Sequence, residues 1–575
     1  MNPWITNGII ASVNKKFYYY KQWKKSTSKT TKLGNIELYG RYKKFRKNLN
    51  ITIKLAKKNY YSKRFDSVKG NIKKTWELIN ELRGKSKSNI KTQFIIDGKL
   101  VEDRREISNG FNIFFSSMAQ KMNTKLYSST LIINNSMEND FKKYLRNRVG
   151  NSIFLSESSE EEVFEIINSL ENGTASDISI LILKKCSRYI SRHLSGFFNT
   201  FLNTGFFPDL LKIGKITPIY KKGDPRSLDN YRPISTLPVF GKILEKIIYS
   251  RLYSFLLSVN AIYENQFGFR KHHSTSHAIN YSINKIMNEI ENKNHVIGAF
   301  IDLSKAFDTI DHEKLLTKLE HYGIRGTCYK LLESYLTDRI QHTNFQNTLS
   351  DSCLIKYGVP QGSVLGPLLF LIYINDIINS TAHGNIVLFA DDTNIFIIGE
   401  TEVEVYNRAN IVLKELYNYM VANQLHINMS KCTYMHFRPR YNNEERQTCA
   451  RTHPYKTELT LNLCGNKLKK VDKVKFLGVI IDDKLNWEAH IDHLEAKLNS
   501  SVVIIKRIKK YIPESEYLNI YNALFMSHLT YCISCWGGVS IFQHVDISAS
   551  EGARDIILGA KCAQLASLFV LIIQL

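Results

Sequence analysis

Short apolar runs and amphipathic stretches alternate through the middle of this chain, and two of the apolar runs end in acid. Residues 295–301 lead directly to Asp302, and residues 386–390 lead to the doublet Asp391–Asp392. Runs of this length, rich in Val, Ile and Phe, are typical of buried strands. The doublet also lies between two apolar runs, as expected at the tip of a tight hairpin. The pattern therefore predicts two buried strands that each present a carboxylate at one end.

Carboxylates in such positions need partners, because a buried charge must be paired or must bind a metal ion. If the two strands lie side by side, their carboxylates form an oxygen-rich cage suited to Mg²⁺. Two metal ions in such a cage can clamp both the attacking and the leaving oxygen of a phosphoryl transfer. A plain hairpin turn with an N-cap would explain the doublet but not the whole set.

Helical patterns predominate on both sides of these strands. Residues 1–125 indicate a basic helical segment, and residues 488–535 are also predicted to be helical. Between them, residues 125–160 are polar and rich in Ser and Asn, which predicts a linker or a mobile loop. A helix is predicted to begin near Ser156, because Glu160–Glu162 favour a helix N-terminus.

Two local motifs predict further element boundaries. Residues 311–319 predict a helix with Asp311 as its N-cap, so Asp308 and Asp311 are expected to be structural. Pro360–Gly362 predicts a turn before a helix that begins near Leu365.

Composition adds a charge asymmetry. The chain has 575 residues, of which 43% are hydrophobic, so it can bury a large core in several domains. Lys and Arg number 78 against 53 acids, a net charge of +25. Residues 1–70 hold 18 of these cations against Glu37 and Asp66 alone, which leaves +16 and indicates a polyanionic partner. The nine cysteines are scattered, as in a reducing compartment.

Aromatic residues are interleaved with these N-terminal cations. One interpretation is RNA binding, with cations on phosphates and rings stacked on bases. The other is a long helix whose rings pack inward while its lysines face solvent. The rings are Phe17, Tyr18, Tyr19, Tyr20, Trp23, Tyr42, Phe45, Tyr60, Tyr61 and Phe65.

Five short blocks follow one another along the chain: Tyr231–Ser235, Gln266–Arg270, Asp302–Asp308, Gly358–Pro367 and Phe389–Asp392. They occur in the order found in reverse transcriptases of non-LTR (LINE-type) retrotransposons, and the chain resembles this family over residues 1–540. The resemblance implies an RNA-directed DNA polymerase with two Mg²⁺ ions, or Mn²⁺ in their place. It also implies an RNA template, a DNA primer or target DNA, dNTPs, no membrane, and a ribonucleoprotein of cytoplasm and nucleus.

The implied fold is of the α/β (α+β) class, a right-hand polymerase with fingers, an antiparallel-sheet palm and a helical thumb. The expected parts are a basic helical extension (1–125), a linker and helical lead-in (126–210), fingers and palm (211–485), a thumb (486–540) and an atypical C-terminal tail (541–575).

The resemblance also assigns roles around the carboxylates. Asp302, Asp391 and the backbone carbonyl of Leu303 are the implied metal ligands, and Asp392 tunes the site. Lys431 is implied to protonate the pyrophosphate leaving group, although an ordinary surface lysine would fit the sequence equally well.

Further residues are implied to bind the nucleotide. Lys221 and Arg232 flank a predicted fingers hairpin, where Arg can hold a triphosphate through two parallel hydrogen bonds. Phe307 matches the steric gate that leaves no room for a 2′-hydroxyl, although a core Phe is the alternative. Gln361 and Gly362 are implied to touch the incoming nucleotide and the template base, or else form a plain loop.

Two more features complete the resemblance. Leu477 and Gly478 match the primer grip, a hairpin beneath the primer end. Arg270 is a further candidate for the triphosphate, the template or a carboxylate of the fingers.

Departures from the family pattern point to an incomplete copy. A Gly-rich block that usually precedes the fingers is altered at residues 173–177, and residues 539–575 lack basic helices and a cysteine–histidine knuckle. The opening Asn2–Thr6 resembles a linker that follows an endonuclease, which would lie upstream of Met1. We therefore expect a truncated or frameshifted copy without the endonuclease. The alternatives are an idle remnant that only binds RNA, and an RNA-dependent RNA polymerase, which Phe307 disfavours.

Overall fold

The structure is a computed structural model, and the chain in it forms two compact units. One unit joins Met1–Asn89 to Trp487–Leu575, and the other is Ile90–Asn486. The residues described are 3–26, 32–83, 93–130, 140–173, 176–439, 459–463, 465–512 and 516–537. The predicted atypical tail, 541–575, lies outside them.

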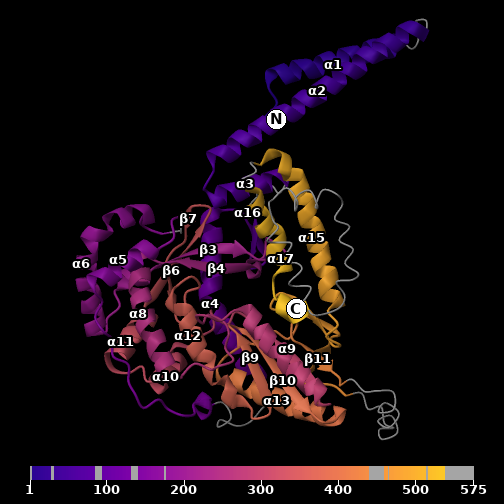
Figure 1. Cartoon of the computed structure of the whole chain (residues 1–575). Coiled ribbons are helices and arrows are strands. Elements are labelled where there is room, and N and C mark those ends of the chain that lie inside the picture. The colour runs from indigo at the N-terminus through magenta and orange to yellow at the C-terminus, as the bar shows by residue number, and fades with distance from the viewer. Residues whose placement is uncertain are drawn as a thin grey trace, which may run out of the picture. The chain divides into compact units, whose positions relative to one another are not determined.

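The second unit is built around a five-stranded sheet in the order β14–β11–β5–β10–β9. Figure 1 labels β9, β10 and β11 of this sheet. Its strands are β5 (His295–Ile301), β9 (Gly384–Phe389), β10 (Asp392–Gly399), β11 (Thr433–Phe437) and β14 (Lys469–Lys470). All neighbours are antiparallel except β11 and β14. Every residue of the central strand β5 is buried, as its apolar run predicts. Helices α9 (Thr275–Glu291) and α13 (Glu402–Ala422) both pack against β5.

Helices surround this sheet and share one large core with it. Nine of the ten residues of α12 (Leu365–Ile374) are buried, and α12 begins where the turn at Pro360–Gly362 predicts. The other helices are α5 (Glu160–Ser169), α6 (Ile180–Thr204), α7 (Asp209–Lys212), α8 (Val239–Ser258), α10 (His312–His321) and α11 (Gly326–Leu336). Asp311 caps α10, as predicted: its carboxylate accepts a hydrogen bond from the amide of Lys314 at 3.0 Å.

A second sheet, in the order β4–β3–β6–β7 with β8 beside β6, lies in the same unit. Its strands are β3 (Gly214–Tyr220), β4 (Tyr231–Thr236), β6 (Arg339–Phe345), β7 (Thr348–Leu349) and β8 (Cys353–Ile355). Helix α4 (Arg104–Thr130) packs along β6, β7 and β8. The prediction of a wholly helical segment over 1–125 is wrong at β1 (Phe94–Ile96) and β2 (Lys99–Val101), which form a hairpin. Strands this short give almost no periodic signal in a sequence.

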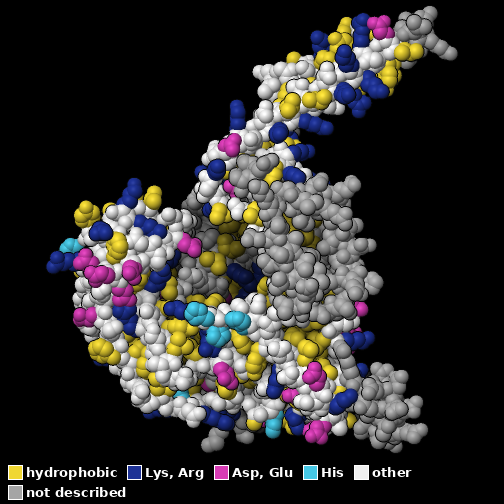
Figure 2. Space-filling model, viewed as in Figure 1, with side chains coloured by type: hydrophobic (Ala, Val, Ile, Leu, Met, Phe, Trp, Pro, Cys, Tyr) yellow, Lys and Arg dark blue, Asp and Glu magenta, His cyan; other side chains and the backbone are white. Residues whose placement is uncertain are grey.

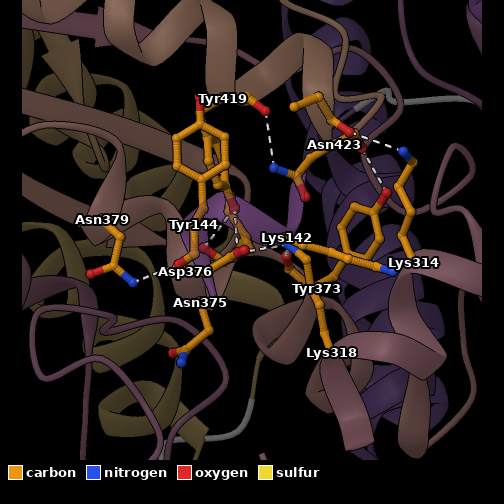
Figure 3. A network of polar contacts seen from close by, with 12 residues as sticks. Lys142, Tyr144, Lys314, Lys318, Tyr373, Asn375, Asp376, Asn379, Tyr419 and Asn423 are labelled. Carbon is orange, nitrogen blue, oxygen red and sulfur yellow. Dashed lines mark hydrogen bonds and ion pairs between the residues drawn. The ribbon is translucent and has the colours of Figure 1, made fainter. Parts of the chain in front are cut away.

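A buried ion pair and its hydrogen bonds join α10 to α12, to α13 and to the short 3-10 helix η3 (Asn375–Ser380) (Figure 3). Lys318 of α10 contacts Asp376 at 2.6 Å, and both side chains are 0% exposed. The hydroxyl of Tyr419 on α13 donates to the same carboxylate at 2.7 Å, and Lys318 also donates to the carbonyl of Tyr373 at 2.6 Å. Such a pair is tolerated in a core only because hydrogen bonds replace the lost hydration.

The polar segment before α5 is tied to the rest of the unit. The amide of Val149 donates to the carbonyl of His321 at 3.1 Å, and Arg325 donates to the carbonyl of Val149 at 2.6 Å. The described part of this segment, from residue 140, is therefore not the mobile loop that its composition allowed. The helix predicted near Ser156 begins at Glu160, where the Ser159 side chain supplies the cap.

The first unit is mostly helical, as predicted for residues 488–535. Its helices are α1 (Asn7–Ser26), α2 (Lys32–Ser67), α3 (Ile72–Leu82), α15 (Glu488–Ile508), α16 (Tyr517–Tyr521), α17 (Ser527–Leu529) and α18 (Ile533–Trp536). A small core joins the two chain segments through residues such as Tyr61, Phe65, Ile79 and Ile508. Among the described residues, no helix is long and apolar enough to span a membrane.

Helices α1 and α2 pair through their aromatic side chains. Trp23 lies parallel to Tyr42 at 6.1 Å between ring centroids, and Tyr19 meets Phe45 edge-on at 5.2 Å. The surface of this pair carries many Lys and Arg side chains (Figure 2). The inward-packing interpretation therefore holds for most of the rings, while Phe17 and Tyr18 remain exposed and most of the cations face solvent.

Candidate active site

The carboxylates predicted at the ends of two buried strands lie together at one end of the central sheet. Strands β9 and β10 form a hairpin whose last pair is Phe389 with Asp392, so Ala390 and Asp391 make its tip. Ala390 has φ 56°, the positive angle that such two-residue turns require. Strand β5 pairs with β10 up to Ile301 opposite Thr393, so Asp302 emerges beside the doublet.

The carboxylates of this cluster repel one another. Burial, followed by repulsion from Asp391 and Asp302, raises the pKa of Asp392 to about 6. The pKa of Asp391 is also raised, by burial first and by Asp302, although the cations Arg232 and Lys221 oppose the shift. Carboxylates that repel one another at the same sheet end, with cations facing them, indicate a site that binds a positively charged group.

Asp302 is held by the segment that precedes Lys431. The ammonium group of Lys431 contacts its carboxylate, and the side-chain amide of Asn428 donates to the same oxygen at 3.0 Å. The amide of Ser304 donates to the carbonyl of His426, and the amide of Asn428 donates to the carbonyl of Asp302. These two backbone hydrogen bonds flank Leu303. The carbonyl of Leu303 is therefore not engaged by this bridge.

Mg²⁺ fits the chemistry of these donors. Asp302 and Asp391 supply hard carboxylate oxygens, and the ammonium group of Lys431 shows that a cation is accepted beside Asp302. In the part of the chain that the structure describes, no three His, Cys, Asp or Glu side chains converge to hold a metal ion by themselves. Water and substrate phosphates would thus complete the shell, as is usual for Mg²⁺.

The block Gln266–Arg270 braces the carboxylate turn. The side-chain oxygen of Gln266 accepts hydrogen bonds from Ala390 at 3.1 Å and Gly268 at 2.9 Å. A Cβ on Gly268 would lie 2.2 Å from the Ala390 nitrogen, so only glycine fits beneath the turn. Arg270 donates to the backbone carbonyls of residues 263, 264 and 266 rather than to a carboxylate of the fingers.

Gln361 and Gly362 lie beside strand β4. The carbonyl of Gln361 accepts from the amide of Ser235 at 2.7 Å, and its side-chain amide donates to both oxygens of Asp308 at 2.8 Å. Gly362 has φ 117°, and a Cβ there would lie 2.6 Å from the carbonyl oxygen of Ser235. Asp308, predicted to be structural, thus orients the Gln361 side chain; loss of hydration raises its own pKa to about 6.

Phe307 is half-buried at the edge of the main core. Its ring stacks on Phe370 of α12, with 4.6 Å between centroids, and meets Phe269 edge-on at 6.0 Å. Both neighbours fix the ring position, and its outer side is left to solvent. A fixed, partly exposed ring five residues beyond Asp302 is compatible both with a steric gate and with an ordinary core residue.

Lys221 and Arg232 lie at the end of the predicted hairpin of β3 and β4, in which Tyr220 pairs with Tyr231. Both side chains are exposed. Partial loss of hydration, followed by repulsion from Arg232 and Lys431, lowers the pKa of Lys221, while Asp302 raises it. The two cations therefore interact electrostatically with the carboxylate cluster.

Leu477 and Gly478 form the tip of a second hairpin, between β15 (Lys473–Phe476) and β16 (Val479–Asp482). Both have positive φ, 45° and 99°, as a two-residue hairpin loop requires. Phe476 packs on Phe300 of β5 at 5.9 Å, which joins this hairpin to the central sheet.

The structure also identifies residues that the sequence did not single out. Gln266 supports the carboxylate turn, and Asn428 holds Asp302. Gln266 opens the block Gln266–Arg270, so its position was a usable signal, and Asn428 lies three residues before Lys431. Their roles depend on contacts between segments more than 100 residues apart, which no local pattern reports.

Comparison with known proteins agrees with the geometry. Residues 219–481 match the family described as reverse transcriptase (RNA-dependent DNA polymerase). The chain is 27% identical over 410 residues, 69% of its length, to the RNA-directed DNA polymerase from mobile element jockey of Drosophila melanogaster, and covers 43% of that protein. It is 33% identical over 221 residues, 38% of its length, to the probable RNA-directed DNA polymerase from transposon BS of the same species, and covers 24% of that protein.

A third relative is the probable RNA-directed DNA polymerase from transposon X-element of the same fly. It is 27% identical over 389 residues, 65% of this chain and 41% of the relative. The chain thus spans less than half the length of these curated relatives. All five sequence blocks and the carboxylate cluster fall within or beside the matched region. Residues 219–481 of this chain are therefore similar to the reverse transcriptase domains of non-LTR retrotransposons.

Proposed function

We propose that this chain is an RNA-directed DNA polymerase that copies RNA into DNA. The observation that carries the proposal is the cluster of Asp302, Asp391 and Asp392 at the end of the buried sheet, faced by Lys221 and Arg232. Its order along the chain and its hairpin geometry agree with the reverse transcriptase match over residues 219–481. The substrates are an RNA template, a DNA primer or target DNA, and dNTPs.

Asp302, Asp391 and the carbonyl of Leu303 would hold the metal ions. When bound, two Mg²⁺ ions neutralise the developing charge on the attacking 3′-oxygen and on the leaving pyrophosphate. Asp392 adds negative potential beside them. Lys431 stands against Asp302, from where its ammonium Nζ can give a proton to the pyrophosphate that leaves.

The nucleotide is bound and selected by residues around the carboxylates. Arg232 and Lys221 hold the triphosphate, because Arg offers parallel donors and Lys a point charge. Phe307 lies beneath the sugar and excludes a 2′-hydroxyl. Gln361, fixed by Asp308, and Gly362 line the nucleotide and the template base.

The architecture supports a right-hand arrangement of these parts. In this proposal the central sheet is the palm, the β3–β4 hairpin belongs to the fingers, and α15 opens the thumb. Leu477 and Gly478 form the primer grip, and the basic helices α1 and α2 bind RNA. The product is made in a ribonucleoprotein of the cytoplasm and nucleus.

A primer-extension assay tests the proposal. The full chain is incubated with a DNA primer annealed to an RNA template, all four dNTPs and Mg²⁺. Extension that requires Mg²⁺ and stops with EDTA is expected. Tight RNA binding without extension, in Mg²⁺ or Mn²⁺, would instead favour an idle remnant that only binds RNA.

The role of the N-terminal helices has a separate test. Deletion of residues 1–70, which carry an excess of +16, should weaken RNA binding and flatten its salt dependence. Each single-strand phosphate that the shortened protein no longer neutralises removes about 0.7 from the slope of log K against log[salt]. A large fall in melting temperature with an unchanged slope would mean that these helices only support the fold.

A further inference from the structure

Asn123 on α4 lies outside residues 219–481, yet its side chain reaches the segment that leads to Lys431. It is 6% exposed. Its Nδ2 donates to the side-chain oxygen of Gln424 at 2.9 Å, and its Oδ1 accepts from Nε2 of His426 at 2.8 Å. Because an amide oxygen can only accept, the Nε2 of His426 must carry the proton. The nitrogen and the oxygen of the Asn123 amide thus both bond side chains of residues 424–426, which follow α13.

This segment turns sharply and needs such support. Gln424 has φ 53°, a left-handed conformation that costs free energy for a residue other than glycine. The side chains of Gln424 and His426 are both buried, so each would lose a hydrogen bond in a dry environment without Asn123. Burial lowers the pKa of His426 to about 4, so the ring stays neutral at neutral pH.

The same segment is bonded directly to the strand end that carries Asp302. The carbonyl of His426 accepts from the amide of Ser304 at 2.7 Å, and the amide of Asn428 donates to the carbonyl of Asp302 at 2.8 Å. The side chain of Asn428 also donates to the Asp302 carboxylate at 3.0 Å. A shift of residues 424–428 would therefore move Asp302 itself.

We propose that Asn123 is a positioning residue for Asp302 and acts through Gln424 and His426. The inference rests on the proposed polymerase role of Asp302. It makes α4, which precedes the family match, a working part of the active site rather than an extension attached to it. Small displacements of metal-binding groups have large effects, since removal of a supporting hydrogen bond typically costs 10- to 100-fold in activity or metal affinity.

Helix α4 supplies a matched control. Asn112 is 1% exposed, and its amide likewise bonds a glutamine: Nε2 of Gln341 donates to Oδ1 of Asn112 at 2.9 Å, and Nδ2 of Asn112 donates to the carbonyl of Asp351 at 2.7 Å. These partners belong to β6 and the turn before β8. Asn112 thus matches Asn123 in residue type, helix and burial, but its bonds lead to the second sheet instead of residues 424–428.

The test compares Asn123→Ala with Asn112→Ala in the full chain. Hydrogen exchange of the metal-free protein is measured in peptides that cover residues 302–304 and 426–428, and primer extension is measured in parallel. We expect Asn123→Ala to accelerate exchange in both peptides and to lower kcat about 10-fold with the dNTP KM nearly unchanged. Asn112→Ala should leave both readouts close to those of the wild type, even if its melting temperature falls as far.

Unchanged exchange at residues 302–304 in Asn123→Ala, or an equal loss of kcat in both variants, would overturn the inference. If Asn123→Ala does not fold, Gln424→Asn is measured instead: asparagine tolerates the positive φ, but is one methylene too short to reach Asn123. The Gln424→Asn variant should accelerate exchange in the same two peptides. Exchange at the wild-type rate in these peptides would also overturn the inference. If the wild-type chain itself fails to extend primers, the proposed function falls while the exchange comparison still decides the role of Asn123.

Discussion

Two lysine–aspartate pairs in the same unit have opposite surroundings. Lys318 and Asp376 are both fully buried, and the carboxylate also accepts from Tyr419. Lys431 and Asp302 are 40% and 28% exposed, and Asp302 lies beside two further carboxylates. Both pairs bring an ammonium group onto a carboxylate, so the contact alone does not distinguish them.

The charged groups around each pair distinguish a structural pair from a functional one. Around Asp376 one carboxylate faces Lys318: burial lowers the pKa of Lys318, Asp376 opposes that shift, and the nearby Lys314 adds to it. Around Asp302 several carboxylates gather: burial first, and then repulsion within the cluster, raises the pKa of both Asp391 and Asp392. Several carboxylates gathered in a partly open site favour binding of an external cation, whereas a single carboxylate buried with its lysine favours only one packing of its helices.

The largest expected effect follows removal of charge from the open site. Asp302→Asn should lower the primer-extension rate by at least about 10³, equivalent to about 4 kcal/mol of transition-state stabilisation. Because repulsion in the cluster is relieved, the melting temperature should stay the same or rise. A steep fall in melting temperature with normal turnover in the folded fraction would mean that this pair is structural too.

The reverse pattern is expected at the buried pair. Asp376→Asn leaves Lys318 in the core without a counter-charge and should cost about 3–5 kcal/mol in the free energy of unfolding, measured by urea denaturation. The protein that remains folded should extend primers at nearly the wild-type rate. As a control, Lys318→Met combined with Asp376→Leu removes both charges and should recover much of the stability. A double variant as unstable as Asp376→Asn would contradict the assignment.

The two lysines should also differ. Lys431→Met is expected to lower kcat by about 10²-fold, the lower range for loss of a general acid, while Lys431→Arg retains part of the rate. Single-turnover kinetics across pH check this, since loss of the acid removes the alkaline limb of the profile. Rates within about twofold of the wild type would make Lys431 an ordinary surface lysine.

A smaller effect on selectivity, rather than rate, is expected at Phe307. Phe307→Val opens space beneath the sugar and should raise kcat/KM for rNTP relative to dNTP by about 10- to 100-fold, the 1–3 kcal/mol typical of steric discrimination in a pocket. The two kcat/KM values are measured on the same template. Because the Phe307 ring also stacks on Phe370, a fall in stability with an unchanged ratio would assign it to the core.

The sequence predicted the parts of this site that are encoded locally. Apolar runs ending in acid gave the strands and the hairpin tip, and a short polar cap gave the start of α10. The β1–β2 hairpin was missed, because three-residue strands have too little periodicity to detect. The partnership of Lys318 with Asp376 was also beyond the sequence, since a lysine in an amphipathic helix resembles a solvent-facing one until its distant partner is known.

The central claim is that the cluster of Asp302 and Asp391 performs RNA-directed DNA synthesis. One measurement tests it most directly: extension of a DNA primer on an RNA template in Mg²⁺ by the wild-type chain and by Asp391→Asn, at matched concentrations of folded protein. Steady extension by the wild type is expected, with a rate at least about 10³-fold lower in the variant. Equal extension by both proteins would contradict the central claim.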